Sequence, residues 1–301
     1  MKPLKGFKDI TIEDKNLLSS YFNKRTSLSY EYLFSSLFMW RNSFNIKYSI
    51  IDGALIILRQ EDKGKYFMQP LGYTKNSINS IIKKLKNLSL KEDNFNFLFG
   101  DVEENFKNYL QFEFKNKIEI FEDINDFEYI YKTKDLIELK GSKYHKKRNH
   151  YNTFKKLYNC KIKEISSDKI KDDCLKLLDI WNKNGNYSFT NFDLERKAIL
   201  ECFHNMNHLD LKSIAIYDNS SIVGFSIGDI LNNTGIIHIE KANNDYSGVY
   251  SFLNREFLLK DFSKTTFINR QEDCGNLGLR QSKESYYPIK KLKKYWIKFK
   301  F

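Results

Sequence analysis

One stretch of the sequence, residues 236–288, restricts the possible fold more than any other. It reads as an apolar strand (IIHIEKA), a polar turn with Gly248, an amphipathic helix, a second strand (TTFINR) and a helix that ends at Tyr-Tyr-Pro. Two parallel strands joined by a helix form a cleft at their carboxyl ends, where ligands usually bind. In this cleft we expect Glu240, Lys241, Asn269, Arg270 and Tyr286.

The first half of the chain shows the same order of elements. KYSIIDGALIIL predicts a hairpin that turns at Asp52-Gly53, and KYFMQPLG, SINSIIKKLKNL and FNFLFG predict a strand, a helix and a strand. Asp101 is expected to cap the helix that follows. In the second half a hairpin is predicted to turn at Asp218-Asn219. FLFGDVEEN even echoes FINRQEDCGN.

Aligning the two hairpins gives an offset of roughly 165–170 residues, which indicates a duplicated unit. The fold class expected is therefore α/β (α+β), with two tandem domains of mixed sheets flanked by helices. The first should span residues 1–130 and the second, which carries the cleft, residues 131–301. The last strand, YWIKFKF, is expected in the second domain.

The charge of the chain points to an anionic partner. Its 301 residues carry a formal net charge of +12, which favours binding of polyanions, although the excess of Lys and Asn also fits the codon bias of an AT-rich genome. The basic residues concentrate in and just before one helix, predicted over His145–Leu157: Lys143, His145, Lys146, Lys147, Arg148, His150, Lys155 and Lys156. This helix either contacts phosphates, with its aromatic residues packing or stacking on a base, or is simply a solvated helix.

No segment indicates secretion, a membrane span or a metal site. The first twenty residues contain acids and no uninterrupted apolar region, and the most apolar run, YLFSSLFMW, is too short to span a bilayer. The four cysteines have no metal-ligand spacing, and His204 and His208 lack the acid of an HExxH motif. A bacterial, cytoplasmic protein with no metal and no peripheral membrane contact is expected.

Two segments carry a family resemblance. DLIELKGSKYHKKRNHYNTFKKLYNCKIKEI resembles the start of the second domain of Fem-type aminoacyltransferases. With HIEKANNDYSGVY and NRQEDCGNLGLRQSKESYYP, the chain is similar to the C-terminal domain of phosphatidylglycerol lysyltransferases. The resemblance implies two tandem GNAT-like (acyl-CoA N-acyltransferase) domains and transfer of an acyl or aminoacyl group to an amine or hydroxyl. The chain departs from the lysyltransferases in lacking their transmembrane portion.

The candidate catalytic residues are Glu240 and Tyr286. A carboxylate in the cleft can deprotonate an acceptor amine or hold it, but a buried Glu240 could equally pair with the adjacent lysine or with Arg270. Tyr286 sits where many GNAT enzymes place the tyrosine that protonates the leaving group. A packed aromatic residue near a helix end is the alternative.

The remaining candidates bind the substrate or the donor. Arginine forks suit a carboxylate or phosphate, although Arg270 and Arg280 could instead form salt bridges to Glu272, Asp273 or Glu284. The substrate- and donor-binding residues expected are His238, Lys241, Gly248, Asn269, Arg270, Arg280, Lys147 and Arg148.

The donor is left open between aminoacyl-tRNA and acyl-CoA, with no further cofactor expected. A CoA pyrophosphate needs several exposed backbone N–H groups at a helix N-terminus, and a loop with Gly248 as its only glycine offers less of this. Two alternatives to a transferase are a catalytically silent module that binds an amino acid or nucleotide, and a protein that binds tRNA or other RNA.

Overall fold

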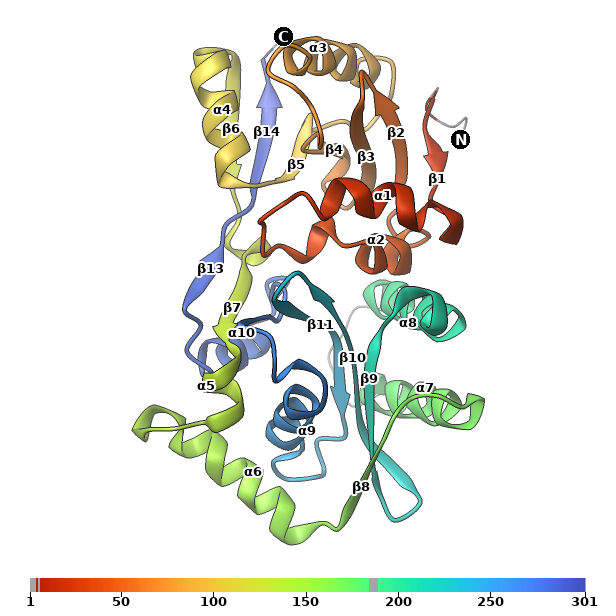
Figure 1. The fold of residues 1–301 in the computed structure, drawn as a ribbon, viewed down its shortest axis with the longest axis vertical. Helices are drawn as coiled ribbons and strands as arrows, with labels where there is room; N and C mark the ends of the chain where they lie inside the picture. Colours follow the sequence, from red (N-terminus) through yellow and green to blue (C-terminus); the bar gives the residue numbers. More distant parts are fainter. Residues whose placement is uncertain (1–3, 5, 184–188, 301) are drawn as a thin grey trace. The chain divides into compact units, whose positions relative to one another are not determined.

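The chain folds into two compact units, each built around its own sheet. The computed structural model describes residues 4, 6–183 and 189–300 (Figure 1). Unit 1 consists of Glu31–Phe127 with the described residues of Met1–Ser27 and Leu292–Phe301, and unit 2 consists of Leu28–Tyr30 and Glu128–Lys291. The α/β class, with two mixed sheets flanked by helices, is confirmed.

The described part of unit 1 contains a seven-stranded sheet. Its strands, in spatial order, are β1 (Lys8–Asp9), β2 (Lys47–Ile51), β3 (Ala54–Glu61), β4 (Gly64–Met68), β5 (Phe99–Val102), β14 (Tyr295–Phe299) and β6 (Ile118–Glu122). The β2–β3 hairpin turns at Asp52 and Gly53, both with positive φ, as their sequence predicts. β4 and β5 are parallel, because the helix between them carries the chain back across the sheet.

The helices of unit 1 follow the apolar periodicity of the sequence. They are α1 (Lys15–Phe22), α2 (Phe34–Trp40), α3 (Ile78–Ser89) and α4 (Glu104–Phe114). The residue that precedes α4 is Glu103, so the expectation that Asp101 caps this helix is wrong. Asp101 lies in β5, where it is buried and accepts hydrogen bonds from Arg59 (3.1 Å) and the Tyr66 hydroxyl (2.8 Å).

Unit 2 has a sheet of the same kind. In the described chain its order is β13 (Lys290–Leu292), β7 (Glu128–Lys132), β12 (Phe267–Asn269), β11 (Thr234–Ala242), β10 (Ser221–Leu231), β9 (Lys212–Asp218) and β8 (Cys160–Lys163). β11 and β12 are parallel, and β10 pairs antiparallel with both β9 and β11. The sequence predicts this arrangement, including the turn at Asn219, which has a positive φ.

Helices cover both faces of the second sheet. They are α5 (Thr133–Glu138), α6 (His145–Leu157), α7 (Asp168–Lys183), α8 (Phe189–Leu209), α9 (Val249–Phe257) and α10 (Leu277–Glu284). Successive residues of a strand face opposite sides. Glu240 contacts Asn254 of α9, and Lys241 contacts Trp181 of α7. α9 and α7 therefore lie on opposite faces of the sheet.

The last strand of the chain belongs to the first sheet. β14 pairs antiparallel with both β5 and β6, and Figure 1 shows it in blue among the orange and yellow strands of unit 1. In unit 2, β7 takes the corresponding place beside β12. The expectation that residues 292–301 belong to the second domain is wrong, while a boundary near residue 130 stays a prediction. Alternating apolar residues predict a strand but do not specify its sheet.

The basic helix α6 has the bounds that its sequence predicts, and it packs on α9. Phe154 and Tyr151 of α6 lie against the ring of Phe252, with centroid distances of 4.6 and 5.5 Å. Gly248 precedes α9 with φ +85°, and a Cβ there would overlap the carbonyl oxygen of His150. The close approach of α6 and α9 therefore requires glycine at this position.

We expect Gly248→Ala to destabilise the protein more than Gly141→Ala. Gly141 has nearly the same φ, +86°, but no atom lies within 4 Å of the point where a Cβ would sit. Alanine at Gly141 should cost about 1–2 kcal/mol for the left-handed backbone. At Gly248 the overlap should add about 1–3 kcal/mol. Urea unfolding of the two variants measures the difference, and equal losses would show that α6 yields to the added methyl group.

Candidate active site in unit 2

β11 and β12 lie side by side for only part of their length. Their parallel pairing runs from Thr234–Phe267 to Ile236–Asn269, whereas β11 continues to Ala242 and stays paired with β10 on its other side. Beyond Ile236 the edge of β11 therefore faces the residues that follow β12. We call this opening the strand split. Several of the expected functional side chains gather there.

An ion pair bridges the strand split. Nη2 of Arg270 donates to Oε1 of Glu240 at 2.8 Å, and the amide of Asn254, from α9, donates to Oε2 at 2.9 Å. The two charged side chains are only 9% and 11% exposed. Burial disfavours the charged guanidinium, but the Glu240 carboxylate more than offsets this and raises the pKa of Arg270. The pairing with Arg270 that the sequence allows for Glu240 is present.

One nitrogen of the Arg270 guanidinium makes no hydrogen bond. This nitrogen, Nη1, is buried without a partner among the described residues. The guanidinium carbon lies 5.0 Å from the ring centroid of Tyr286. A buried donor with no acceptor costs about 1–3 kcal/mol. An anionic or carbonyl oxygen of a ligand would remove this cost.

Tyr286 lies between two cations. Its ring is 4.1 Å from Nζ of Lys147 and 5.0 Å from the Arg270 guanidinium carbon, and its hydroxyl is 3.3 Å from Oγ of Ser251. Burial raises the pKa of Tyr286, so the phenol stays protonated near neutral pH. Tyr286 can therefore donate a proton to a bound group.

Lys147 is the residue of α6 that turns toward this cluster. Burial and the neighbouring charge of Arg270 lower its pKa to about 8, against a smaller opposite effect of Glu240. A sizeable fraction of Lys147 is therefore neutral at physiological pH, and the neutral amine can accept a proton. Glu240, Arg270, Tyr286 and Lys147 form what we call the unit 2 cluster.

His238 forms a second link across the strand split. The side-chain amide nitrogen of Gln271 lies 3.0 Å from Nδ1 of His238 and donates to it. Nδ1 of His238 is therefore the acceptor, and the proton of the imidazole is on its Nε2. Burial lowers the pKa of His238 to about 4, and Nε2 has no partner among the described residues. His238 is thus a neutral imidazole with one unused donor.

Lys241, an expected binding residue, turns away from the unit 2 cluster. It lies on the other face of the sheet, where it pairs with Glu195 at 2.9 Å. Its Nζ is also 3.5 Å from the ring centroid of Trp181. Lys241 therefore has a structural role between β11, α7 and α8.

Asn269 and Arg280 also have structural partners. Asn269 is fully buried and donates to Glu128 and to the carbonyl of Leu28. Arg280 forms two hydrogen bonds of 2.8 Å with Asp273, which is the salt bridge that its sequence allows. Both side chains hold the segment after β12 in place rather than reaching into the unit 2 cluster.

Arg148 and Gly248 have local structural roles as well. Nη1 of Arg148 donates to the carbonyls of Leu139 and Gly141, and so satisfies backbone acceptors after α5. Gly248 permits the contact with α6 described above. The carbonyl of His150 therefore faces the N-terminus of α9, where a phosphate would otherwise find backbone N–H groups.

Lys283 is a buried residue that no sequence pattern singled out. The residue is 5% exposed, and Nζ donates to the carbonyls of Arg270 (2.6 Å), Gln271 (3.2 Å) and Glu272. These bonds hold the turn that directs Arg270 and Gln271 toward β11. Burial lowers the pKa of Lys283 to about 8. A lysine on a polar helix normally predicts a solvated side chain, so its role could not be anticipated.

Tyr250 closes the far end of the strand split. Its hydroxyl lies 3.3 Å from both the backbone nitrogen and the carbonyl oxygen of Ala242 and accepts a 2.9 Å hydrogen bond from Trp181. The backbone groups of Ala242 that face away from β10 are thereby satisfied within the chain. An extended ligand could pair with them only by displacing Tyr250.

The sequence profile described as phosphatidylglycerol lysyltransferase, C-terminal, matches residues 24–298. The chain belongs to this family. The resemblance expected from the basic helix and residues 236–288 is thus confirmed.

Solved structures agree with this assignment. A conserved protein of unknown function from Bacteroides thetaiotaomicron is 30% identical, with a TM-score of 0.88 and full coverage of both chains. L-PGS from Bacillus licheniformis (16% identity, TM-score 0.63, 95% and 92% covered) and FemX (8%, 0.65, 97% of each) share the fold.

A sequence relative in Mycoplasmoides gallisepticum, an uncharacterised protein, is 30% identical over 179 residues. The match covers 56% of this chain and 55% of that protein, so the chain spans about half the length of this curated relative. The family relates the chain to phosphatidylglycerol lysyltransferases, and L-PGS and FemX share its fold. In the described part of this family member, no helix is both long enough and apolar enough to cross a bilayer.

Within this lysyltransferase-family chain, the matching place in unit 1 is filled by aromatic rings. The echo between FLFGDVEEN and FINRQEDCGN puts Gly100 at the position of Arg270. A Cβ on Gly100 would overlap the rings of Tyr66 and Trp296, which contact each other edge to face at 4.7 Å. The strand pair of unit 1 therefore has no room for an arginine where unit 2 carries one.

We expect the rate at which an amine-selective acylating reagent labels Lys147 to increase with pH, with a midpoint near pH 8. Only the neutral amine is nucleophilic, so its labelling rate should rise steeply between pH 7 and 9. Quantitative mass spectrometry measures the rate, with the exposed neighbour Lys146 as an internal reference in every sample.

The charge of Glu240 should affect the midpoint of the same Lys147 titration. Because Glu240 raises the pKa of Lys147, Glu240→Gln should move the midpoint to lower pH. A midpoint that is unchanged in the variant would show that Glu240 and Lys147 are not electrostatically coupled.

Proposed function

We propose that the chain transfers an aminoacyl group from a charged tRNA to an amine or hydroxyl acceptor, with the unit 2 cluster as the reaction site. The observation that carries this proposal is the unpartnered Nη1 of Arg270, buried beside a second cation, Lys147. Once Lys147 has taken up the proton of the acceptor, two cations and one carboxylate leave the unit 2 cluster with an excess of positive charge. Such a site suits an oxygen atom that becomes negative in the transition state.

The chemistry assigns a role to each member of the unit 2 cluster. The acceptor nitrogen or oxygen attacks the ester carbonyl, and the bond between that carbonyl and the ribose oxygen of the tRNA breaks. Arg270 stabilises the negative charge on the carbonyl oxygen. Tyr286 gives its proton to the departing ribose oxygen, and neutral Lys147 takes up the proton that the acceptor loses. Solvent then restores both groups.

Glu240 suits the clamping of an amine better than the role of general base. Its carboxylate already accepts hydrogen bonds from Arg270 and Asn254. A carboxylate has about four acceptor positions, so Glu240 can also accept from the α-ammonium group of an aminoacyl ester. This interaction would select an aminoacyl group over a simple acyl group.

The surroundings of β11 favour an aminoacyl ester over acyl-CoA. The pantetheine arm of CoA is an extended chain with amide groups, which could pair with an open strand edge as a peptide does, but Tyr250 already satisfies Ala242 at this edge. A pyrophosphate needs free N–H groups at a helix N-terminus, and the carbonyl of His150 faces Gly248 there. The Tyr250 hydroxyl and the His150 carbonyl would both have to move before CoA could place its pantetheine arm along β11 and its pyrophosphate at the N-terminus of α9.

The outer surface of α6 supports tRNA as the carrier. Six basic residues of this segment are exposed: Lys143, His145, Lys146, His150, Lys155 and Lys156. Lys147 projects from the same helix toward Tyr286. A polyanion bound along α6 would therefore bring its end near the unit 2 cluster, and its affinity should fall steeply with salt.

The direct test compares two tyrosine substitutions in an aminoacyl-transfer assay with a panel of charged tRNAs. Tyr286→Phe keeps the ring between Lys147 and Arg270 but removes the acidic hydroxyl. We expect kcat to fall about a hundredfold or more, with little change in KM, because the lost group acts as a general acid. Tyr287→Phe, at the exposed neighbour, should leave kcat unchanged.

The two alternatives give different results in the same experiments. A wild-type protein that transfers nothing from any charged tRNA or acyl-CoA, but melts at a higher temperature with a free amino acid, would be a silent binding module. A protein that binds tRNA in a salt-dependent manner without turnover would be an RNA-binding protein. Equal activity of Tyr286→Phe and wild type would remove Tyr286 from the mechanism.

A further inference from the structure

Two buried hydrogen-bond donors of the strand split have no acceptor among the described residues: Nη1 of Arg270 and Nε2 of His238. The proposed transfer places the carbonyl oxygen of the aminoacyl ester on Nη1 of Arg270 and gives His238 no role. A buried N–H group without an acceptor is unfavourable. A second acceptor on the same ligand would satisfy His238.

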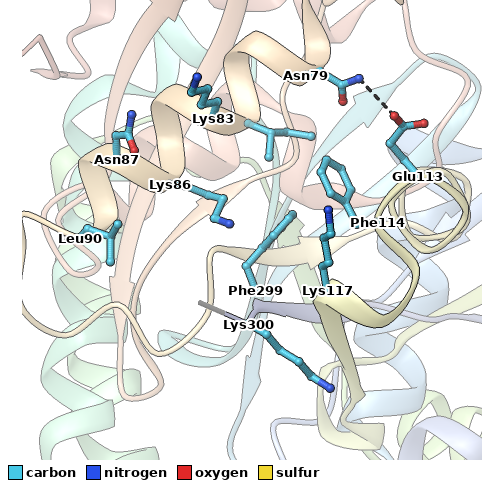
Figure 2. Close-up of a pocket in the computed structure, with 11 residues that line it drawn as sticks. Asn79, Lys83, Lys86, Asn87, Leu90, Glu113, Phe114, Lys117, Phe299 and Lys300 are labelled. Atoms are coloured by element: carbon cyan, nitrogen blue, oxygen red, sulfur yellow. Dashed lines mark hydrogen bonds between the residues drawn. The ribbon is translucent and has the colours of Figure 1, made fainter.

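The groove of unit 1 shows no comparable sign of a ligand. It lies between α3 and the C-terminal end of α4, and Phe299 lines it (Figure 2). Its residue Glu113 accepts a hydrogen bond from Asn79 at 3.3 Å. None of its described lining residues has a buried side-chain nitrogen or oxygen without a partner. The donors of the strand split therefore point to a ligand more directly than this groove does.

A bulge in β11 takes His238 out of the regular alternation of the strand. On β10, Ile227 pairs with Ile239 and the next residue, Gly228, pairs with Ile237. His238, between these two partners, therefore has no counterpart on β10. The pairing of β11 with β12 has ended two residues earlier. A bulge re-aims a side chain, and this one lies where the strand split begins.

Gln271 decides which nitrogen of His238 carries the proton. Its side-chain amide donates to Nδ1 at 3.0 Å, which leaves the proton on Nε2. Burial lowers the pKa of His238 to about 4, so the ring is neutral at physiological pH. Gln271 itself has a left-handed backbone, φ +58°, held by Lys283 on its carbonyl and by Asn269 on its N–H. A strained residue held this firmly indicates a functional constraint.

The two unpaired donors are close enough to meet one ligand. They belong to the links Arg270–Glu240 and Gln271–His238, which follow each other along the strand split. Glu240 and His238 are two residues apart, a distance of about 7 Å along a strand. An aminoacyl group whose carbonyl lies on Arg270 therefore has its side chain within reach of His238.

We propose that Nε2 of His238 donates a hydrogen bond to the side chain of the aminoacyl group, so that the protein selects an amino acid with a hydroxyl or amide acceptor. This inference rests on the proposed function, because it takes the ligand to be an aminoacyl ester. Lysine fits poorly, since its ammonium group has three donors and no acceptor and would lie near the charge of Arg270. An aliphatic side chain would leave Nε2 unpaired in the complex.

One acceptor of the same turn would favour the opposite choice. Oε2 of Glu272 is buried without a partner among the described residues, and a lysyl side chain would pair with it. Glu272, however, belongs to neither link across the strand split, and its Oε1 accepts from the Tyr30 hydroxyl at 2.8 Å. Glu272 and His238 thus give opposite expectations for lysine, which a binding measurement separates.

Calorimetric titration of the full chain with 3′-aminoacylamido-adenosines tests the proposal. In these probes an amide replaces the ester, so they bind without being transferred, and the same nucleoside carries every amino acid. Three pairs have similar shapes: threonine and valine, asparagine and leucine, glutamine and methionine. In at least one pair the polar member should bind about tenfold or more tightly than its apolar partner, because the apolar side chain leaves Nε2 unpaired. It should also bind more tightly than the lysyl probe.

Substitutions link this preference to the imidazole. His238→Phe keeps a ring but has no N–H, so both members of the pair should bind equally well, whereas general damage to the fold would weaken both. Gln271→Met no longer fixes the tautomer and should reduce the preference in part. His204→Phe, at an exposed histidine of the same unit, is the matched control and should keep the wild-type preference.

Four results would overturn the proposal: no probe binds, polar and apolar members bind the wild type equally, the lysyl probe binds best, or His238→Phe keeps the preference. The transfer assay with Tyr286→Phe tests the proposed function separately. A protein that shows the preference but transfers nothing retains the His238 site and loses the reaction. A protein that transfers without any preference retains the reaction alone.

Discussion

The separation of β11 from β12 is the constraint on which the rest of unit 2 depends. Two parallel strands that stayed paired to their ends would satisfy each other's backbone and leave no place for charged side chains. Here the pairing stops at Ile236 and Asn269, and the space beyond is occupied by side chains. Arg270–Glu240 and Gln271–His238 link the two strands where backbone hydrogen bonds end. Lys283 supports both links through the carbonyls behind them.

In unit 1 the charges of the buried cations are balanced by carboxylates, unlike those of the unit 2 cluster. There Arg59 and Lys294 are buried next to carboxylates: Arg59 contacts Glu31 and Asp101, and Lys294 contacts Glu31 at 2.7 Å. Burial and the charge of Glu31 raise the pKa of Asp101 to about 8, so the group carries a proton when cations alone cannot balance it. Unit 2 instead keeps a cationic excess around Tyr286. The ion cluster of unit 1 balances its own charge, whereas under the proposed function the charge left in unit 2 is balanced by the ligand.

Local sequence patterns predicted the elements well and the charge partners only in part. Helical periodicity identified the bounds of α6, and the Asp-Gly and Asp-Asn turns identified both hairpins, because these signals depend on neighbouring residues. The pairing of Glu240 with Arg270, and that of Arg280 with Asp273, could be stated only as alternatives, since a sequence does not contain the distances that decide between a ligand and a salt bridge. Lys241 was placed with Glu240, although adjacent strand residues face opposite sides. The role of Lys283 depends on three carbonyls brought together by the turn after β12, and no local pattern encodes that.

The position of β14 has a consequence for how the protein is made. The sheet of unit 1 needs residues 295–299 between β5 and β6, yet these residues leave the ribosome after all of Glu128–Lys291. β7, which pairs with β12, is translated before the other strands of the unit 2 sheet. The pairs of the unit 2 sheet from β7 to β8 can therefore form before residues 295–299 are translated, whereas β5 and β6 each keep one unpaired edge until then. The N-terminal segment thus keeps these strand edges exposed through the synthesis of unit 2, and exposed edges of this kind are where a nascent chain is most prone to associate wrongly.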